Sequence, residues 1–137
     1  MGQRNNFWLI AGGMNIFSAL VHTILGQITL VKPLLQSTIE HQEITEWLGV
    51  WHIVTVVLFA SSYYLIRQGL HQRQNRNLAL IEFIAYLYLL FSFVFIALSI
   101  INNVFAPQWV LLLPIALFAL AGINKERKYT PALSLTS

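Results

Sequence analysis

Four long apolar runs divide the sequence, and shorter polar segments separate them. The runs cover residues 7–31, 47–66, 78–101 and 104–123. A helix needs about 20 predominantly apolar residues to cross a hydrocarbon core of about 30 Å. The first three runs are long enough by themselves, and the fourth becomes so when it is extended back from Trp109 to Val104. The pattern therefore predicts an all-α membrane protein with four transmembrane helices.

Small and polar residues recur along these runs with a period of about seven residues, which is two helical turns. The first run carries two such registers: Gly12, Ala19 and Gly26, then Asn15, His22 and Thr29. The second run also carries two: Thr45, His52 and Phe59, then Leu48, Thr55 and Ser62. In lipid, small and polar residues mark the faces where helices pack. The period predicts left-handed packing, and the short connections predict an up-down antiparallel bundle.

The charged residues are few and lie mainly on one side of the predicted membrane. They make up 9% of the 137 residues, against roughly 25% in soluble domains. Lys32 is the one basic residue in the first connection, whereas the other Lys and Arg residues precede the first run, separate the second from the third, or follow the fourth. The positive-inside rule therefore predicts a multi-pass cell-membrane protein with both termini in the cytoplasm. The net charge of +3 is then explained by the orientation of the protein in the membrane. We therefore expect no nucleic-acid partner.

The chain is expected to form a single transmembrane domain over residues 1–137, with residues 124–137 as a cytoplasmic tail. This layout resembles that of small four-helix proteins of the bacterial inner membrane. The first outer connection is acidic, with three glutamates and one histidine in its second half: Glu40, His41, Glu43 and Glu46. Ser37 followed by Glu40 resembles a capping box, so the second helix is expected to begin as early as Thr38.

Two histidines in the apolar runs, His22 and His52, form the candidate site. Each lies about four residues outward from the middle of its helix, or roughly 6 Å at 1.5 Å per residue. Two antiparallel neighbours would thus present imidazoles at the same depth. The predicted site consists of two histidines, two glycines that leave room beside them and two hydroxyls: His22, His52, Gly26, Gly49, Thr55 and Ser92. The leading interpretation is a binding or accessory membrane protein that holds a cofactor or hydrophobic ligand between helices.

Several occupants of this histidine pair remain open. Two facing imidazoles suit a b-type haem, and the same space suits another flat molecule such as a quinone. A metal ion at His22 and His52 would lack a third strong ligand at that level, because the Ser92 hydroxyl is a poor one. The pair can also serve only as hydrogen-bonding groups between helices, as in a purely structural membrane subunit.

A transport function is the main alternative. Glu82, Asn15 and Ser62 would relay protons or cations inward from the acidic outer connection, and histidine titrates near neutral pH. One bundle of four helices encloses little water, so this function would need a homodimer or a partner membrane protein. Enzyme chemistry is poorly supported, because the chain has no aspartate and no cysteine and its serines have no base at a recognisable spacing.

Overall fold

The computed structural model describes residues 4–72 and 75–134, and in the last helix it describes side chains only as far as Lys128. Its elements are α1 (Asn6–Gly26), the π-helical segment η1 (Gln27–Val31), α2 (Lys32–Leu35), α3 (His41–Leu70), α4 (Leu78–Ile101) and α5 (Gln108–Ser134). Four segments are long and apolar enough to cross a membrane: Asn6–Leu35, His41–Leu70, Leu78–Ile101 and Gln108–Lys128. The prediction of an all-α bundle of four membrane helices is confirmed.

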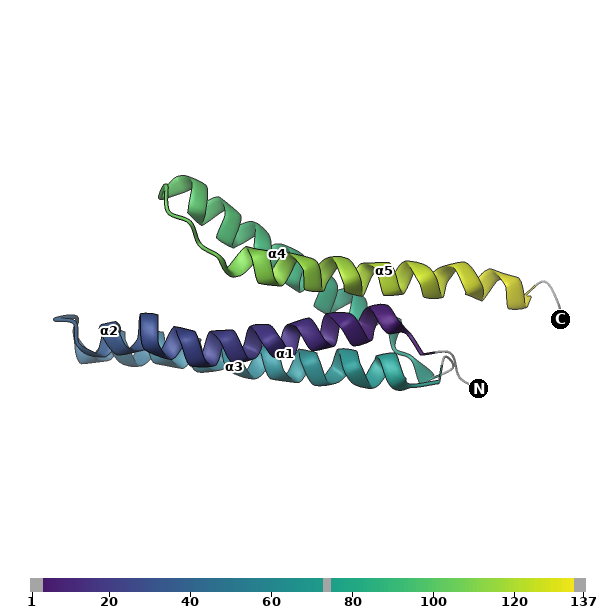
Figure 1. Ribbon diagram of the computed structural model, residues 1–137, viewed down its shortest axis with the longest axis horizontal. Coiled ribbons are helices and arrows are strands. Elements are labelled where there is room, and N and C mark those ends of the chain that lie inside the picture. The colour runs from purple at the N-terminus through teal and green to yellow at the C-terminus, as the bar shows by residue number, and fades with distance from the viewer. Residues whose placement is uncertain (1–3, 73–74, 135–137) are drawn as a thin grey trace.

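The four helices form two antiparallel hairpins (Figure 1). α1 packs along α3 in one hairpin, α4 packs along α5 in the other, and α1 also packs against α5. We call the end that holds Arg4 and the α3–α4 connection the basic end, and the end that holds connections 36–40 and 102–107 the tip end. The hairpins lie together at the basic end and diverge toward the tip end. The bundle is therefore V-shaped.

The first membrane segment changes its winding near the tip end. Gln27–Val31 is π-helical and leads into α2, where Pro33 occupies the first turn. Proline lacks an N–H, and its ring collides with the carbonyl of the residue four positions earlier in a regular α-helix. That residue is Thr29, which lies inside the π-helical segment. The wider turn therefore accommodates Pro33 and lets the helix continue to Leu35.

Two predicted helix starts differ from the structure. α3 begins at His41, and the Glu40 side chain makes no cap hydrogen bond. The Ser37 hydroxyl instead donates to the Leu34 carbonyl at 2.6 Å, which ends α2, so the expected capping box does not form. α5 begins at Gln108 rather than at residue 104, because the chain turns after α4, where Asn103 has a φ of 50°.

The last helix is longer than expected. Residues 124–137 were expected to form a cytoplasmic tail after the fourth membrane helix; α5 continues through this stretch as far as Ser134, and residues 135–137 lie outside the described part of the chain. The first turns of that extension pack on the rest of the bundle, since Glu126 is only 5% exposed. Hence the polar sequence after the fourth apolar run belongs to the basic end of the bundle.

The predicted packing registers are mostly buried on α1, where His22 is half-buried and Thr29 is exposed, and they are only partly buried on α3. Gly12, Asn15 and Ala19 of α1 are buried, as expected. On α3, Leu48, Thr55 and Ser62 are half-buried or buried, whereas the other register, Thr45, His52 and Phe59, is exposed. The inward face of α3 instead includes Ile44, Leu58, Ser61 and Leu65. α3 is thus rotated relative to the prediction.

Candidate functional site

His22 lies in the tip half of α1 and packs on Trp51 of α3. The imidazole and indole rings are stacked, with centroids 3.8 Å apart and planes inclined by 17°. Nε2 of His22 donates a hydrogen bond to the Trp51 carbonyl at 3.3 Å, and the Thr55 hydroxyl donates to the same carbonyl at 3.0 Å. His22 is therefore held by one residue through both its ring face and its ring edge.

Trp51 fills the space that was predicted beside His22. The indole lies directly over Gly26, and a Cβ on that residue would overlap the ring atoms of Trp51. The absence of a side chain at Gly26 therefore lets Trp51 of α3 pack directly on α1. The rotation of α3 follows from this contact, because a half-buried Trp51 against Gly26 turns the following residue, His52, away from α1.

The predicted inward placement of His52 is therefore wrong. His52 is exposed on α3, and within the described part of the chain no hydrogen bond to its ring is present. Gly49 is also exposed, and a Cβ there would meet nothing within 4 Å. The two imidazoles of one chain do not face each other, so a haem or metal held between them is not supported. Among the described residues, no three His, Asp or Glu side chains form a group that could hold a metal ion.

A buried hydrogen-bonded ring joins three helices in the middle of the bundle. Nδ2 of Asn15 donates to the Ser61 hydroxyl at 2.9 Å, and the Tyr88 hydroxyl donates to Oδ1 of Asn15 at 2.8 Å. The Ser61 and Tyr88 hydroxyls lie 2.7 Å apart, which closes the ring. All three residues are buried. Asn15, one of the residues in the predicted relay, is thus engaged in contacts that connect α1 with α3 and α4.

The other hydroxyls of the predicted site and relay bind their own helices. Ser62 donates to the Leu58 carbonyl at 2.7 Å, and Ser92 donates to the Tyr88 carbonyl at 2.7 Å. Such bonds to the carbonyl four residues earlier satisfy a hydroxyl that is buried in an apolar environment. Ser92 lies next to Tyr88 and the buried ring, and the structure does not bring it to His22 or His52.

Glu82 forms an ion pair at the basic end. Its Oε2 lies 2.8 Å from Nη2 of Arg127, and the two side chains are 28% and 57% exposed. Ser62, which the relay hypothesis places in series with Glu82, binds its own helix instead. The predicted relay residues Asn15, Ser62 and Glu82 therefore each have a separate set of partners.

The acidic residues at the tip end are solvated. Glu40, His41, Glu43 and Glu46 are all exposed. Gln42 donates to Oε1 of Glu46 at 3.2 Å within the same helix. These side chains form a polar cap on the first turns of α3, distant from the hydrogen-bonded ring at Asn15.

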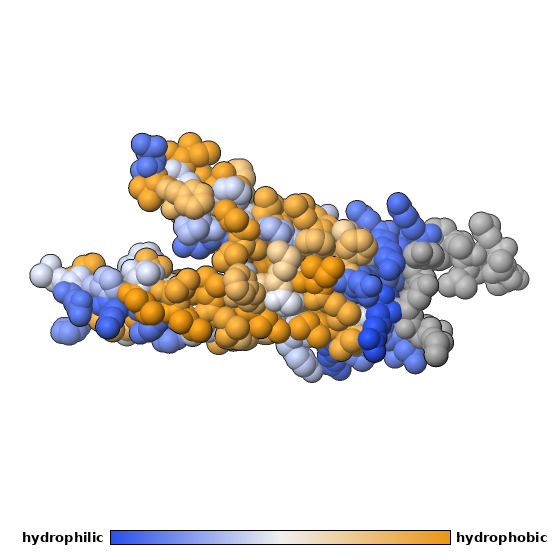
Figure 2. Space-filling model, in the orientation of Figure 1, coloured by the Kyte–Doolittle hydropathy of each residue, from blue (hydrophilic) through white to orange (hydrophobic). Residues whose placement is uncertain are grey.

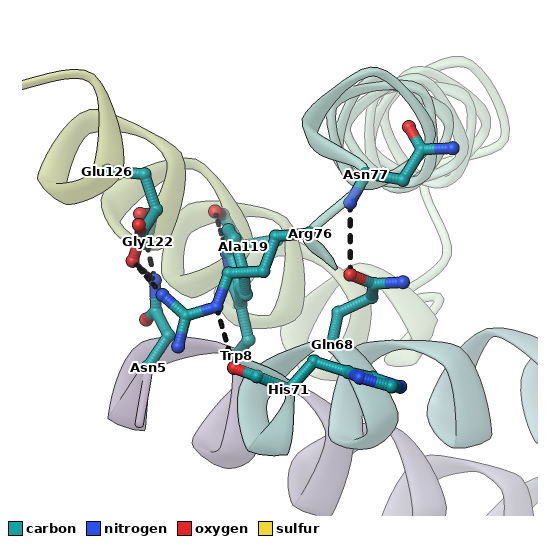
Figure 3. Close-up of polar contacts among 9 residues, drawn as sticks. All are labelled: Asn5, Trp8, Gln68, His71, Arg76, Asn77, Ala119, Gly122 and Glu126. Carbon is teal, nitrogen blue, oxygen red and sulfur yellow. Dashed lines mark hydrogen bonds and ion pairs between the residues drawn. The ribbon is translucent and has the colours of Figure 1, made fainter. Parts of the chain in front are cut away.

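The most extensive polar cluster lies at the basic end, where the sequence predicted no site (Figure 3). Arg76 and Glu126 form an ion pair in which the side chains are only 2% and 6% exposed. Nδ2 of Asn5 donates to Glu126 at 2.9 Å and to the Gly122 carbonyl at 3.1 Å. Nε of Arg76 donates to the His71 carbonyl at 3.1 Å. We call Asn5, Trp8, Arg76 and Glu126 the terminal lock.

Trp8 forms the floor of the terminal lock. Its Nε1 donates to the Ala119 carbonyl at 3.1 Å, and the guanidinium carbon of Arg76 lies 5.4 Å from the centroid of its ring. A Cβ on Gly122 would overlap the indole. Trp8 is fully buried, so the lock joins α1 to α5 through both apolar and polar contacts. The sequence contains one indication of this contact: the small residues Ala119 and Gly122, which Trp8 packs against, lie about one turn apart in the fourth apolar run.

No family of known proteins, no curated protein and no solved structure matches the chain. Chemically, the terminal lock and the ring at Asn15 are hydrogen-bonded structural clusters, although Oδ1 of Asn5 is buried in the lock without a hydrogen-bond partner among the described residues. His22 is a half-buried polar ring in the tip half of α1.

Proposed function

We propose that this protein is a multi-pass cell-membrane accessory protein that binds a small hydrophobic ligand in its outer half. Its basic end faces the cytoplasm in this proposal, because Lys32, near the end of the segment Asn6–Leu35, is the one Lys or Arg residue toward the tip end. Both termini are then cytoplasmic, and the ligand is reached from the outer leaflet.

The main support for this proposal is the separation of the two hairpins in the tip half of the bundle. Figure 2 shows a notch between the two arms at that end; apolar residues make up much of both arms, and polar residues lie at their tips and along part of the notch. The lock and the ring at Asn15 hold the hairpins together in the other half. In a bilayer we expect apolar molecules to fill the notch, because contact between water and the apolar surface of the arms would be unfavourable.

His22 supplies the polar group for such a ligand. It lies seven residues after Asn15, which places it on the same face of α1 two turns nearer the tip. The Asn15 side chain reaches Tyr88 of α4, so this face of α1 is directed toward the second hairpin. Farther out that hairpin diverges, so the seven-residue spacing from Asn15 puts His22 on the face of α1 that we infer to border the notch.

The hydrogen bonding of His22 indicates the class of ligand. Because Nε2 donates to the Trp51 carbonyl, the neutral ring carries its proton on Nε2 and Nδ1 is an acceptor. In the described part of the chain Nδ1 has no hydrogen-bond partner. An apolar ligand with a hydroxyl group fits this arrangement, and a reduced quinone is the representative that also matches the flat shape expected from the sequence.

The test is equilibrium binding of decylubiquinol to the protein in lipid nanodiscs, combined with mass spectrometry of the small molecules that co-purify with it. We expect saturable binding, and we expect His22→Ala to weaken it about three- to tenfold, the usual effect of one lost hydrogen bond. His52→Ala is the matched control, since it removes the same side chain from an exposed position on α3, and it should leave the affinity unchanged.

The same experiment distinguishes the alternatives. Absence of saturable binding in the unmodified protein, together with no co-purified compound, contradicts the proposal and favours a purely structural membrane subunit. A Soret absorption band that is lost in His22→Ala favours haem over a quinol. The transport alternative gains no support from the residue contacts, because Glu82 pairs with Arg127 and Asn15 belongs to a closed ring.

A further inference from the structure

The exposed face of α3 carries a second packing pattern that the single chain does not use. Its members are spaced alternately by four and three residues, and all are exposed: Thr45, Gly49, His52, Val56, Phe59 and Tyr63. We call these six residues the α3 stripe. Alternating spacings of four and three keep residues on one seam of a helix that pairs with another in a left-handed crossing. The register that the sequence assigned to an inward face thus exists, but it points away from the chain's own core.

His52 indicates that lipid does not cover this stripe. It lies in a membrane-spanning segment between strongly exposed apolar residues, with Ile53 64% and Val56 67% exposed. No other described residue hydrogen-bonds its ring. Polar ionisable side chains within a membrane are costly when they face lipid, and they almost always face protein or a water-filled space. A protein partner on the stripe would satisfy this requirement.

Gly49 points to a helix as the covering element. Four other glycines serve contacts inside the chain, because a Cβ would collide with Ile66 at Gly12, with Trp51 at Gly26, with Leu9 at Gly69 and with Trp8 at Gly122. At Gly49 a Cβ meets nothing within 4 Å. Small residues on a membrane helix allow another backbone to approach closely. Gly49 lies one turn from His52 and would leave room for that approach.

The charges along the stripe fit a second copy of this chain. From Thr45 to Tyr63 the stripe contains no Lys, Arg, Asp or Glu, so identical copies face each other without like charges in the membrane. Glu43 and Glu46 lie off the stripe on the helical wheel. Arg67, one turn beyond Tyr63, is bonded through its Nε to Nε2 of His71 on its own helix at 3.1 Å.

We propose that two copies pair through the α3 stripe and bring their two His52 side chains together. Copies inserted with the same topology are related by a two-fold axis along the membrane normal, so each residue of the stripe meets its counterpart at equal depth. A neutral imidazole has one donor and one acceptor nitrogen. One His52 ring can therefore donate an N–H···N hydrogen bond to the other, which gives each imidazole one polar partner. The facing histidine pair that one chain lacks is formed between two chains.

Disulfide cross-linking tests this pairing, because the chain has no cysteine. Single cysteines are introduced at positions 44 to 60 of α3, and native membranes are oxidised with copper phenanthroline. A disulfide needs Cα atoms within about 4.4–6.8 Å of each other. We expect covalent dimer to form most readily with Gly49→Cys and Val56→Cys, at least fivefold above Val50→Cys, which is 54% exposed but lies off the stripe. Leu90→Cys on α4, 58% exposed, is the control for random collision.

A second measurement examines the His52 pair itself. Dimerisation in liposomes, followed by resonance energy transfer between labelled copies, should weaken about threefold in His52→Leu, because interhelical hydrogen bonds in membranes are individually modest. His52→Asn, which keeps a donor and an acceptor, should retain most of the association. Equal cross-linking at all positions, monomers at every protein density, or adducts with a different protein in place of the dimer would each overturn the proposal. Ligand binding at His22 is measured separately, so these outcomes leave that proposal untouched.

Discussion

At the scale of single residues, the structure depends on a few buried polar groups that bond to one another. Arg76 and Glu126 are almost completely buried, and Asn5 adds a third hydrogen-bonding group to the same carboxylate. A buried ion pair contributes little net stability, but the removal of one member leaves an uncompensated buried charge. The terminal lock should therefore be far more sensitive to substitution than the ion pair of Glu82 and Arg127, which is partly exposed.

Glu126→Ala should lower the free energy of unfolding by about 3–5 kcal/mol, because the Arg76 guanidinium would lose its buried counterion. Glu82→Ala should lower it by less than about 1 kcal/mol, since its ion pair is exposed on the Arg127 side. Unfolding of both variants in mixed detergent micelles, followed by circular dichroism, measures the difference. Equal losses for the two variants would mean that Arg76 and Glu126 do not hold the hairpins together.

At the scale of helices, hydropathy predicts the elements well but predicts their rotation poorly. The four membrane helices follow from the length of the apolar runs. The rotation of α3 does not, because apolar residues cover most of a lipid-embedded helix and only the small and polar positions carry information. Both registers on α3 were read as inward, and the structure buries the one that includes Ser62 while it exposes the one that includes His52. Trp51, an apolar residue, decided between them by packing on Gly26 and His22.

The same limit explains what the sequence showed of the candidate site. The position of His22 in the tip half was predictable from spacing along α1, and so was its place on the same face as Asn15. Its partner was not predictable, because stacking of an indole on an imidazole leaves no periodic signal in the sequence. The terminal lock was missed because Asn5 and Glu126 are 121 residues apart, so their contact depends on the tertiary arrangement.

Trp51→Ala tests whether this residue sets the rotation of α3. We expect it to lower the free energy of unfolding by about 2 kcal/mol, below the roughly 3–5 kcal/mol typical of a fully buried tryptophan, because Trp51 is only half-buried. Trp47→Ala is the matched control, since Trp47 is 63% exposed one turn away on the same helix, and its effect should be small. A larger effect of Trp47→Ala would indicate that the α1–α3 contact differs from the one described.

At the scale of the whole molecule, the two hairpins form a V that is closed at the basic end and open at the tip end (Figure 1). Contacts between the hairpins at Asn5, Trp8 and Asn15 all lie on the basic half of α1. The notch at the other end is the proposed ligand site. The α3 stripe lies on a face that the chain leaves exposed, and it is the proposed surface for a second copy. Both proposals depend on the open arrangement of the hairpins and on the rotation of α3.

Distances between pairs of spin labels test this arrangement most directly. One pair is placed at the tip end by Gln36→Cys and Asn102→Cys, and the other at the basic end by Gln72→Cys and Lys128→Cys; all four residues are exposed. Doubly labelled protein is diluted with unlabelled protein in nanodiscs, so that distances within one chain are observed by pulsed electron resonance. The V-shaped bundle predicts a clearly longer distance for the tip pair than for the basic pair. A tip distance as short as the basic one would show a closed bundle and would contradict the account.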